Sequence, residues 1–207
     1  MVILILYVDD LLITGDDHLI NQCKKDLITE FEMKDLRLLH YFLGLKVQQN
    51  SGSIILNQGK YTSNILKRFS MWNCKPMSSP METNLHKLKE AAAESPSIDS
   101  TLYRQMIGSL MYLVNTKPNI CYAVNALSQF MCEPKEIHLV VVKHIMRYLQ
   151  DTLNFGLKYE KVALDLHGFT DLDWGGSVKD KKSTLGCCFS LGLAMISWIC
   201  RKQSSVA

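Results

Sequence analysis

The chain has 207 residues, of which 47% are hydrophobic and 21% are charged, and its formal net charge at pH 7 is +3. This composition excludes wholesale disorder and supplies enough apolar residues to bury a core. The small positive charge is compatible with a nucleic-acid partner but does not identify one.

Cysteine usage and the lengths of the apolar runs narrow the class of protein further. The seven cysteines are odd in number and show no Cys-x-x-Cys spacing. This argues against a zinc ribbon or a secreted disulfide scaffold and predicts reduced thiols in an intracellular protein. The apolar runs are well below the roughly 18 residues that a transmembrane helix needs, so no membrane partner is expected.

The chain begins with two short apolar runs that flank a pair of aspartates. Asp9 and Asp10 lie between the runs, and Gly15-Asp16-Asp17 follows as a turn signal. This pattern predicts a buried β-hairpin with both carboxylates at its tip. Two interpretations stay open at this point. Aspartate is a common turn residue, and a carboxylate pair in an apolar setting also suits a divalent cation.

Further elements follow in chain order. Asp16-Asp17 can cap a helix, and helical periodicity extends this predicted helix to about Phe31. A second hairpin is predicted over residues 41–48 and 53–58, with Asn50-Ser51-Gly52 as its turn. The next helix, over residues 60–69, leaves three cations for solvent or phosphate: Lys60, Lys67 and Arg68.

The second half of the chain separates into a linker, a helical segment and a β-rich segment. Prolines and serines without periodicity predict a linker over residues 73–100. Three helices are predicted within 101–160, capped or opened by Asp99, Pro118 and Pro134. The final segment, 161–207, alternates like strands and carries Asp171 and Asp173 near the end of its first strand. The segment before the linker is 1–72.

An ordered series of short motifs runs through all of these segments. The series includes Tyr7-Val8-Asp9-Asp10, Tyr41-Phe42-Leu43-Gly44, Leu102-Tyr103-Arg104-Gln105, Arg147-Tyr148-Leu149, Asp171-Leu172-Asp173-Trp174 and Ile196-Ser197-Trp198. It resembles the Pol polyprotein of copia-type LTR retrotransposons, from the middle of the reverse transcriptase into the start of RNase H, over essentially the whole chain.

The resemblance implies a fold, a reaction and a set of site residues. The fold is α+β: a partial reverse-transcriptase palm of two β-hairpins with helices, a helical thumb or connection segment, and the first strands of an RNase H-like sheet. The reaction is two-metal nucleotidyl transfer on an RNA template or RNA–DNA hybrid, with Mg²⁺ as cofactor. The implied catalytic and metal-binding residues are Asp9, Asp10 and Asp171, with Asp173 as the alternative to Asp171. The implied nucleic-acid contacts are Tyr7, Lys60, Lys67 and Arg68.

The sequence also departs from what the resemblance implies. A third palm aspartate, the fingers and further RNase H carboxylates are not among these 207 residues, so we expect this chain to be inactive by itself. Arg37 stands where the family pattern implies glycine, which matters if that position needs a positive φ. Two alternatives stay open: a non-catalytic nucleic-acid-binding remnant, which would also use Lys143 and Arg147, and the product of a decayed reading frame with unpartnered strands.

Overall fold

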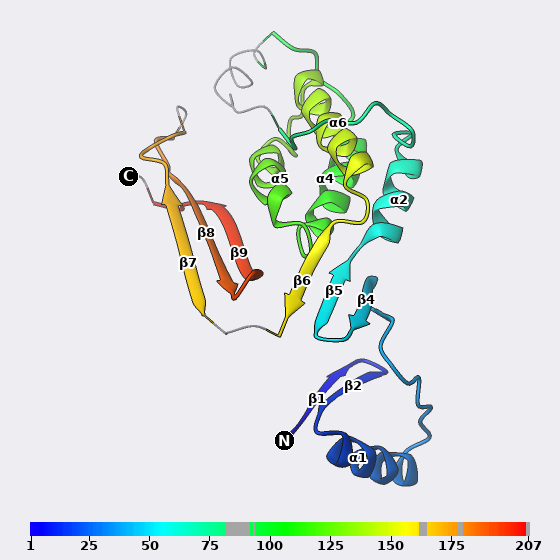
Figure 1. Ribbon diagram of the computed structural model, residues 1–207. Helices are drawn as coiled ribbons and strands as arrows, with labels where there is room; N and C mark the ends of the chain where they lie inside the picture. Colours follow the sequence, from blue (N-terminus) through cyan, green and yellow to red (C-terminus); the bar gives the residue numbers. More distant parts are fainter. Residues whose placement is uncertain (82–91, 93, 162–164, 178–179, 206–207) are drawn as a thin grey trace. The chain divides into compact units, whose positions relative to one another are not determined.

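Helices and strands are interspersed along the chain, which confirms the predicted α+β class. The computed structural model describes residues 1–81, 92, 94–161, 165–177 and 180–205, so much of the predicted linker lies outside the described residues. The chain divides into two compact units, residues 1–39 and 40–207. Within the described residues, the strands form sheets of two, four and three strands (Figure 1).

The first unit is a hairpin followed by a helix. Strands β1 (Val2–Tyr7) and β2 (Asp10–Gly15) pair antiparallel, and α1 (Asp17–Glu30) follows. This confirms the predicted hairpin, but the prediction that it is buried is wrong. None of residues 1–39, all of which are described, is buried, and Leu6 is 73% exposed. The physical reason is size, because two strands and one helix cannot cover both faces of an apolar ribbon.

A tight turn after α1 resolves the question raised by Arg37. Arg37 has a φ of +65°, the conformation in which glycine is unstrained. Its backbone N–H donates to Asp35 Oδ1 at 2.8 Å, and Lys24 Nζ donates to Asp35 Oδ2 at 3.0 Å. These bonds, led by the one from Arg37, lower the pKa of Asp35. A local Asp side chain therefore supports the left-handed turn without a glycine.

The four-stranded sheet joins distant parts of the second unit. Strands β3 (Tyr41–Phe42), β4 (Leu45–Asn50) and β5 (Ser53–Asn57) form a meander that contains the predicted second hairpin. Strand β6 (Gly156–Glu160), which the sequence patterns did not predict, pairs antiparallel with β5 from Ser53↔Glu160 to Asn57↔Gly156 (Figure 1). The segment between β5 and β6 is thereby closed into a loop that contains the helices.

The helices enclose the main hydrophobic core. They are α2 (Gly59–Arg68), α4 (Ser100–Leu113), the 3₁₀ turn η1 (Pro118–Ile120), α5 (Cys121–Ser128) and α6 (Glu136–Asp151), at the predicted places. As predicted, Asp99 caps α4, its Oδ1 accepting from Thr101 N at 2.7 Å. The core contains apolar side chains from each of these α-helices: Ile65, Leu66, Tyr103, Met106, Ile107, Leu110, Leu113, Val124, Leu127, Val142, Ile145, Met146 and Leu149. None of the described helices has the length and apolarity to cross a membrane.

A buried lysine fixes the end of α6. Lys117 Nζ donates to the carbonyl oxygens of Thr152, at 2.5 Å, and Phe155, at 3.0 Å. Burial lowers the pKa of Lys117 to about 8. The lysine thus binds the carbonyl of the C-cap residue of α6 and the carbonyl of the residue immediately before β6.

The three-stranded sheet consists of β7 (Leu166–Leu172), β8 (Thr184–Leu191) and β9 (Ala194–Lys202), in that order and antiparallel. All three strands were predicted. Side-chain bonds attach β9 to the helices and to β6: for example, Trp198 Nε1 donates to Val114 O at 2.9 Å, and Tyr159 Oη donates to Met195 O at 3.1 Å. The sheet is therefore anchored at the end of α4 and on β6.

Two glycine substitutions test the role of the β5–β6 pairing. A Cβ on Gly156 would lie 2.1 Å from Leu56 O, a backbone atom, so we expect Gly156→Ala to lower the free energy of unfolding by about 1–3 kcal/mol. The matched control is Gly108→Ala on an exposed part of α4, where a Cβ meets nothing within 4 Å. This control should gain about 0.5–1 kcal/mol from helix propensity. Urea unfolding followed by circular dichroism measures both, and equal stabilities would contradict the prediction.

The buried histidine of α6 predicts a pH dependence of stability. His138 is 2% exposed and stacks on Phe130, with ring centroids 3.8 Å apart, and its Nδ1 accepts from Lys135 N at 3.0 Å. Burial, with a smaller effect of the Lys135 charge, lowers the pKa of His138 from 6.5 to about 4. The unfolded chain therefore binds this proton more readily. The associated stability is present above pH 6.5 and is lost as the pH falls towards 4.

An NMR titration of the histidine rings, combined with urea midpoints at each pH, checks this prediction. His167→Ala serves as the control, because that histidine is exposed on β7. An ordinary titration midpoint for His138 in the folded protein would rule the prediction out.

Candidate functional site

The aspartate pair lies at the tip of the β1–β2 hairpin. Tyr7 and Asp10 are the last residues paired in the register, so the connection is the two-residue turn Val8–Asp9. Val8 has a φ of +53°, which is a strained conformation for a β-branched residue. Both aspartates are exposed. The local fold thus places two carboxylates in solvent on a turn whose backbone is held out of its usual range.

The carboxylate pair is a partial set of metal ligands. Carboxylate oxygens are the donors that Mg²⁺ prefers, and one or two protein carboxylates with waters and substrate phosphates form many Mg²⁺ sites. Within the described parts of the chain, no group of three or more His, Cys, Asp or Glu side chains could hold a metal ion. Asp9 and Asp10 therefore fit a divalent cation in donor type, whereas a site built from protein ligands alone would need more of them.

A second adjacent pair of aspartates gives a useful contrast. Asp16 lies just before α1, and its carboxylate lies 2.5 Å from the N-terminal ammonium of Met1. Asp17 is the first residue of α1, where a negative charge favours the positive end of the helix dipole. Asp16 and Asp17 therefore have local structural roles, whereas Asp9 lies in the two-residue turn of the hairpin.

The two aspartates at the end of β7 differ in their surroundings. Asp171 is exposed, and its Oδ1 accepts from Leu172 N at 3.0 Å. Asp173 Oδ1 accepts from Thr184 N, the first residue of β8, at 2.6 Å. The Asp173 carboxylate thus bridges two strands, whereas Asp171 contacts only its neighbour through this bond. Asp171 belongs to the second compact unit and shares no element with Asp9 and Asp10.

Helix α2 carries a polar stripe that includes two of the predicted nucleic-acid contacts. Lys60, Asn64 and Lys67 follow one another at i, i+4 and i+7, and all three are exposed. Lys67 Nζ lies 5.0 Å from the ring of Trp72, which is 38% exposed. The sequence reasoning missed Asn64 and Trp72, although helical spacing and the aromatic residue after the helix were available signals.

The remaining predicted cation, Arg68, is partly engaged by the protein. Its Nη2 donates to Gln105 Oε1 at 3.2 Å, and its guanidinium lies 5.3 Å from the ring of Phe69. Lys67 and Arg68 also form the last turn of α2, where cations favour the negative end of the helix dipole. Arg68 is therefore a weaker candidate for phosphate contact than the two lysines.

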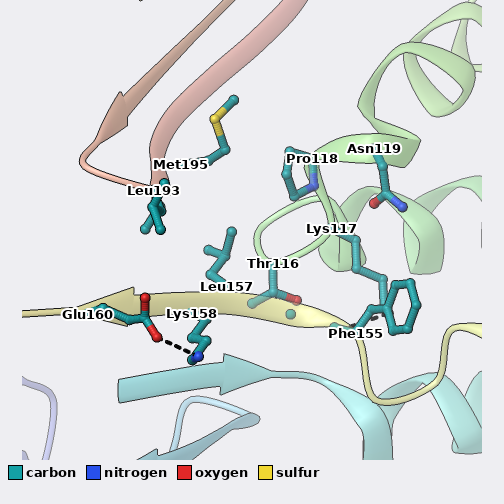
Figure 2. A pocket seen from close by; sticks show the side chains of 12 residues that line it. Thr116, Lys117, Pro118, Asn119, Phe155, Leu157, Lys158, Glu160, Leu193 and Met195 are labelled. Carbon is teal, nitrogen blue, oxygen red and sulfur yellow. Dashed lines mark hydrogen bonds and ion pairs between the residues drawn. The ribbon is translucent and has the colours of Figure 1, made fainter. Parts of the chain in front are cut away.

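A pocket of about 480 Å³ lies elsewhere in the second unit, between η1, β6 and the β8–β9 turn (Figure 2). Leu193 and Met195 lie across it from Leu157 of β6. Its charged lining is engaged within the protein, because Lys158 pairs with Glu160 at 2.5 Å and Lys117 bonds to backbone carbonyls. None of the predicted site residues lines this pocket.

Comparisons with known proteins agree with this picture. The family model described as reverse transcriptase (RNA-dependent DNA polymerase) matches residues 1–83. The chain is 38% identical over 206 residues to an uncharacterized mitochondrial protein of Arabidopsis thaliana, covering 99% of this chain and 85% of that protein. It is 41% identical over 208 residues to the retrovirus-related Pol polyprotein from transposon RE1 of Arabidopsis thaliana, covering 100% of this chain and 14% of the polyprotein. No solved structure matches significantly.

A third relative extends the likeness to another plant. The chain is 38% identical over 214 residues to the retrovirus-related Pol polyprotein from transposon TNT 1-94 of Nicotiana tabacum, covering 100% of this chain and 16% of the polyprotein. The chain thus spans most of the mitochondrial relative and a small part of each polyprotein. These matches favour a reverse-transcriptase fragment over the product of a decayed reading frame. The chain belongs to the reverse transcriptase family of copia-type retrotransposon Pol polyproteins.

Proposed function

We propose that this chain supplies part of the active site and part of the nucleic-acid-binding surface of an RNA-directed DNA polymerase. The observation that carries the proposal is the exposed Asp9–Asp10 pair on a strained two-residue turn, inside the region that the reverse-transcriptase model matches. This arrangement suits a ligand pair, because the hairpin register already holds both aspartates at one end of the hairpin.

In this proposal, Asp9 and Asp10 hold a divalent cation, Mg²⁺ in the cell, together with substrate phosphates. When bound, such a cation activates the primer hydroxyl and neutralises charge on the triphosphate. The role of this chain is to position the two carboxylate ligands. The β1–β2 pairing and the left-handed Val8 hold both aspartates at the exposed tip of the hairpin.

The nucleic-acid partner is proposed to be an RNA template or an RNA–DNA hybrid. Lys60 and Lys67 are spaced two turns apart on the exposed face of α2, so both can reach the phosphate backbone of one duplex. Trp72 next to Lys67 adds an aromatic surface of the kind that stacks on bases. Tyr7, paired with Asp10 at the hairpin tip, is the proposed contact beside the aspartates.

The regional assignments remain part of the proposal. Residues 1–72 are assigned to the palm and the start of the thumb, 73–100 to a linker, 101–160 to the thumb or connection segment, and 161–207 to an RNase H-like domain. The antiparallel order β7-β8-β9 supports the last assignment. We favour Asp171 over Asp173 as its metal-binding carboxylate, because Asp173 is committed to the backbone of Thr184.

The aspartate pair can be tested with Mn²⁺ as a paramagnetic probe of the Mg²⁺ site. We expect Mn²⁺ to broaden the backbone amide NMR signals of residues 8–11 before others in the first unit. The double variant Asp9→Asn/Asp10→Asn should abolish this broadening, because asparagine keeps the shape but removes the charge.

The matched control is Asp16→Asn/Asp17→Asn, which changes the other adjacent pair by the same chemistry and should leave the broadening at residues 8–11 intact. Equal broadening around both pairs, or none at the hairpin tip, would show that Asp9 and Asp10 are not a cation site.

The α2 surface can be tested by the salt dependence of binding. Fluorescence anisotropy with a labelled RNA–DNA hybrid should show weaker binding for Lys60→Ala/Lys67→Ala at low salt. The slope of log K against log salt should decrease in magnitude by about 0.7–0.9 for each lysine removed.

Lys25→Ala/Lys161→Ala is the charge-matched control, since both lysines are exposed and lie outside α2. If the control loses as much affinity as the α2 variant, binding depends on net charge and the proposed surface is not the contact. Because binding and cation affinity are measured separately, one can fail while the other stands.

A further inference from the structure

Two cysteines that are far apart in the sequence lie at the contact between α5 and β9. Cys121 is the first residue of α5, and Cys200 is near the end of β9. The two elements pack against each other within the second unit. Both residues are partly exposed, and neither is in a disulfide.

A hydrogen bond made by Asn125 indicates that both cysteines lie on the same side of the contact between α5 and β9. Asn125 Nδ2 donates to Cys200 Sγ at 3.6 Å. Cys121 precedes Asn125 by four residues on the same helix, and residues spaced by four share one helix face. The face of α5 that contacts Cys200 is therefore the face that carries Cys121.

The electrostatics of the two thiols support direct proximity. Burial raises the pKa of Cys121, and the backbone N–H of Cys200 partly offsets this effect. Burial also raises the pKa of Cys200, and a negative charge on Cys121 raises it further. Each cysteine therefore affects the ionisation of the other.

We propose that Cys121 and Cys200 form a reversible disulfide that cross-links the helical core to the three-stranded sheet. The oxidant is a low-molecular-weight disulfide such as glutathione disulfide. One cysteine thiolate attacks a sulfur of that disulfide, giving a mixed disulfide and one free thiol. The second cysteine thiolate then attacks the protein sulfur, the protein disulfide forms, and a second small thiol leaves. Two protein thiols are oxidised and one disulfide is reduced to two thiols.

The link would add a covalent bond to a contact that is otherwise held by hydrogen bonds. The described attachments of β9 include Trp198 to Val114 and Asn125 to Cys200. A disulfide closing the long loop between α5 and β9 restricts the unfolded chain more than a short loop does. The proposal concerns the second unit alone and does not depend on the proposed polymerase role of Asp9 and Asp10.

One other cysteine is a competitor for Cys200. Cys188 is opposite Trp198 in the β8–β9 register, and Gly186 is opposite Cys200. Since alternate residues of a strand share a face, Cys188 lies diagonally across from Cys200 on the same side of the sheet. Cys187 points to the other side. The disulfide connectivity of the oxidised protein therefore shows whether Cys200 pairs with Cys121 or with Cys188.

The test is a disulfide map of the full chain. The protein is incubated with graded ratios of oxidised to reduced glutathione, free thiols are alkylated, and the protein is digested with chymotrypsin. Cleavage after Tyr122, Phe130, Tyr148, Phe189 and Trp198 places Cys121, Cys132, the Cys187–Cys188 pair and Cys200 on separate peptides. We expect a peptide linked through Cys121 and Cys200 that disappears on reduction.

Variants and melting temperatures complete the test. Cys121→Ser and Cys200→Ser should each abolish the link, whereas Cys132→Ser and Cys188→Ser should retain it. The oxidised wild-type chain should melt on the order of 5–10 °C above the reduced chain, and dithiothreitol should reverse the shift. A dominant Cys188–Cys200 link would overturn the proposal. So would alkylation of both Cys121 and Cys200 at the most oxidising ratio. Both outcomes are read from the wild-type chain, even if a variant fails to fold.

Discussion

The antiparallel pairing of β5 with β6 is the constraint on which the rest of the second unit depends. It brings residues 53–57 against residues 156–160 and so closes the intervening helices over one core. Gly156 permits this because no side chain could fit against Leu56 O at that point. Lys117 assists from the core side, since its ammonium holds the carbonyls between the end of α6 and the start of β6. The β5–β6 hydrogen bonds and the buried Lys117 thus determine where the chain rejoins the sheet after the helices.

The first unit, unlike the second, has no buried core. Its strands consist mostly of aliphatic residues, a composition typical of strands covered on both faces, yet none of its residues is buried. The hairpin keeps its form through the β1–β2 ladder and not through a core of its own. The consequence for the site is favourable, because Asp9 and Asp10 remain hydrated and do not meet the penalty of unpaired burial. Their arrangement is set by backbone geometry, above all by the left-handed Val8.

Much of the local structure and the family could be predicted from residues alone. Apolar spacing identified the helices of the core, apolar runs with turn residues identified both early hairpins, and strand-like alternation identified the three final strands. The motif order pointed to the copia-type Pol family, which the comparisons bear out. The residue types of the candidate site could be predicted from the sequence, but the hydrogen-bond partners of these residues could not. The difference between Asp171 and Asp173 depends on the hydrogen bond from Thr184, and the commitment of Arg68 depends on Gln105, which is on another helix.

The sequence was enough to predict most of the elements and their order, the aspartate turn and the family, because these depend on short-range periodicity and on motifs a few residues long. It also predicted burial for the first hairpin, since aliphatic strands are usually covered, and that prediction was wrong for this chain. Three features could be seen only in the folded chain: the strand β6, the packing of β9 on α5, and the contact shared by Cys121 and Cys200. These features depend on pairings between distant residues, where partner and geometry, and not local preference, set the free energy.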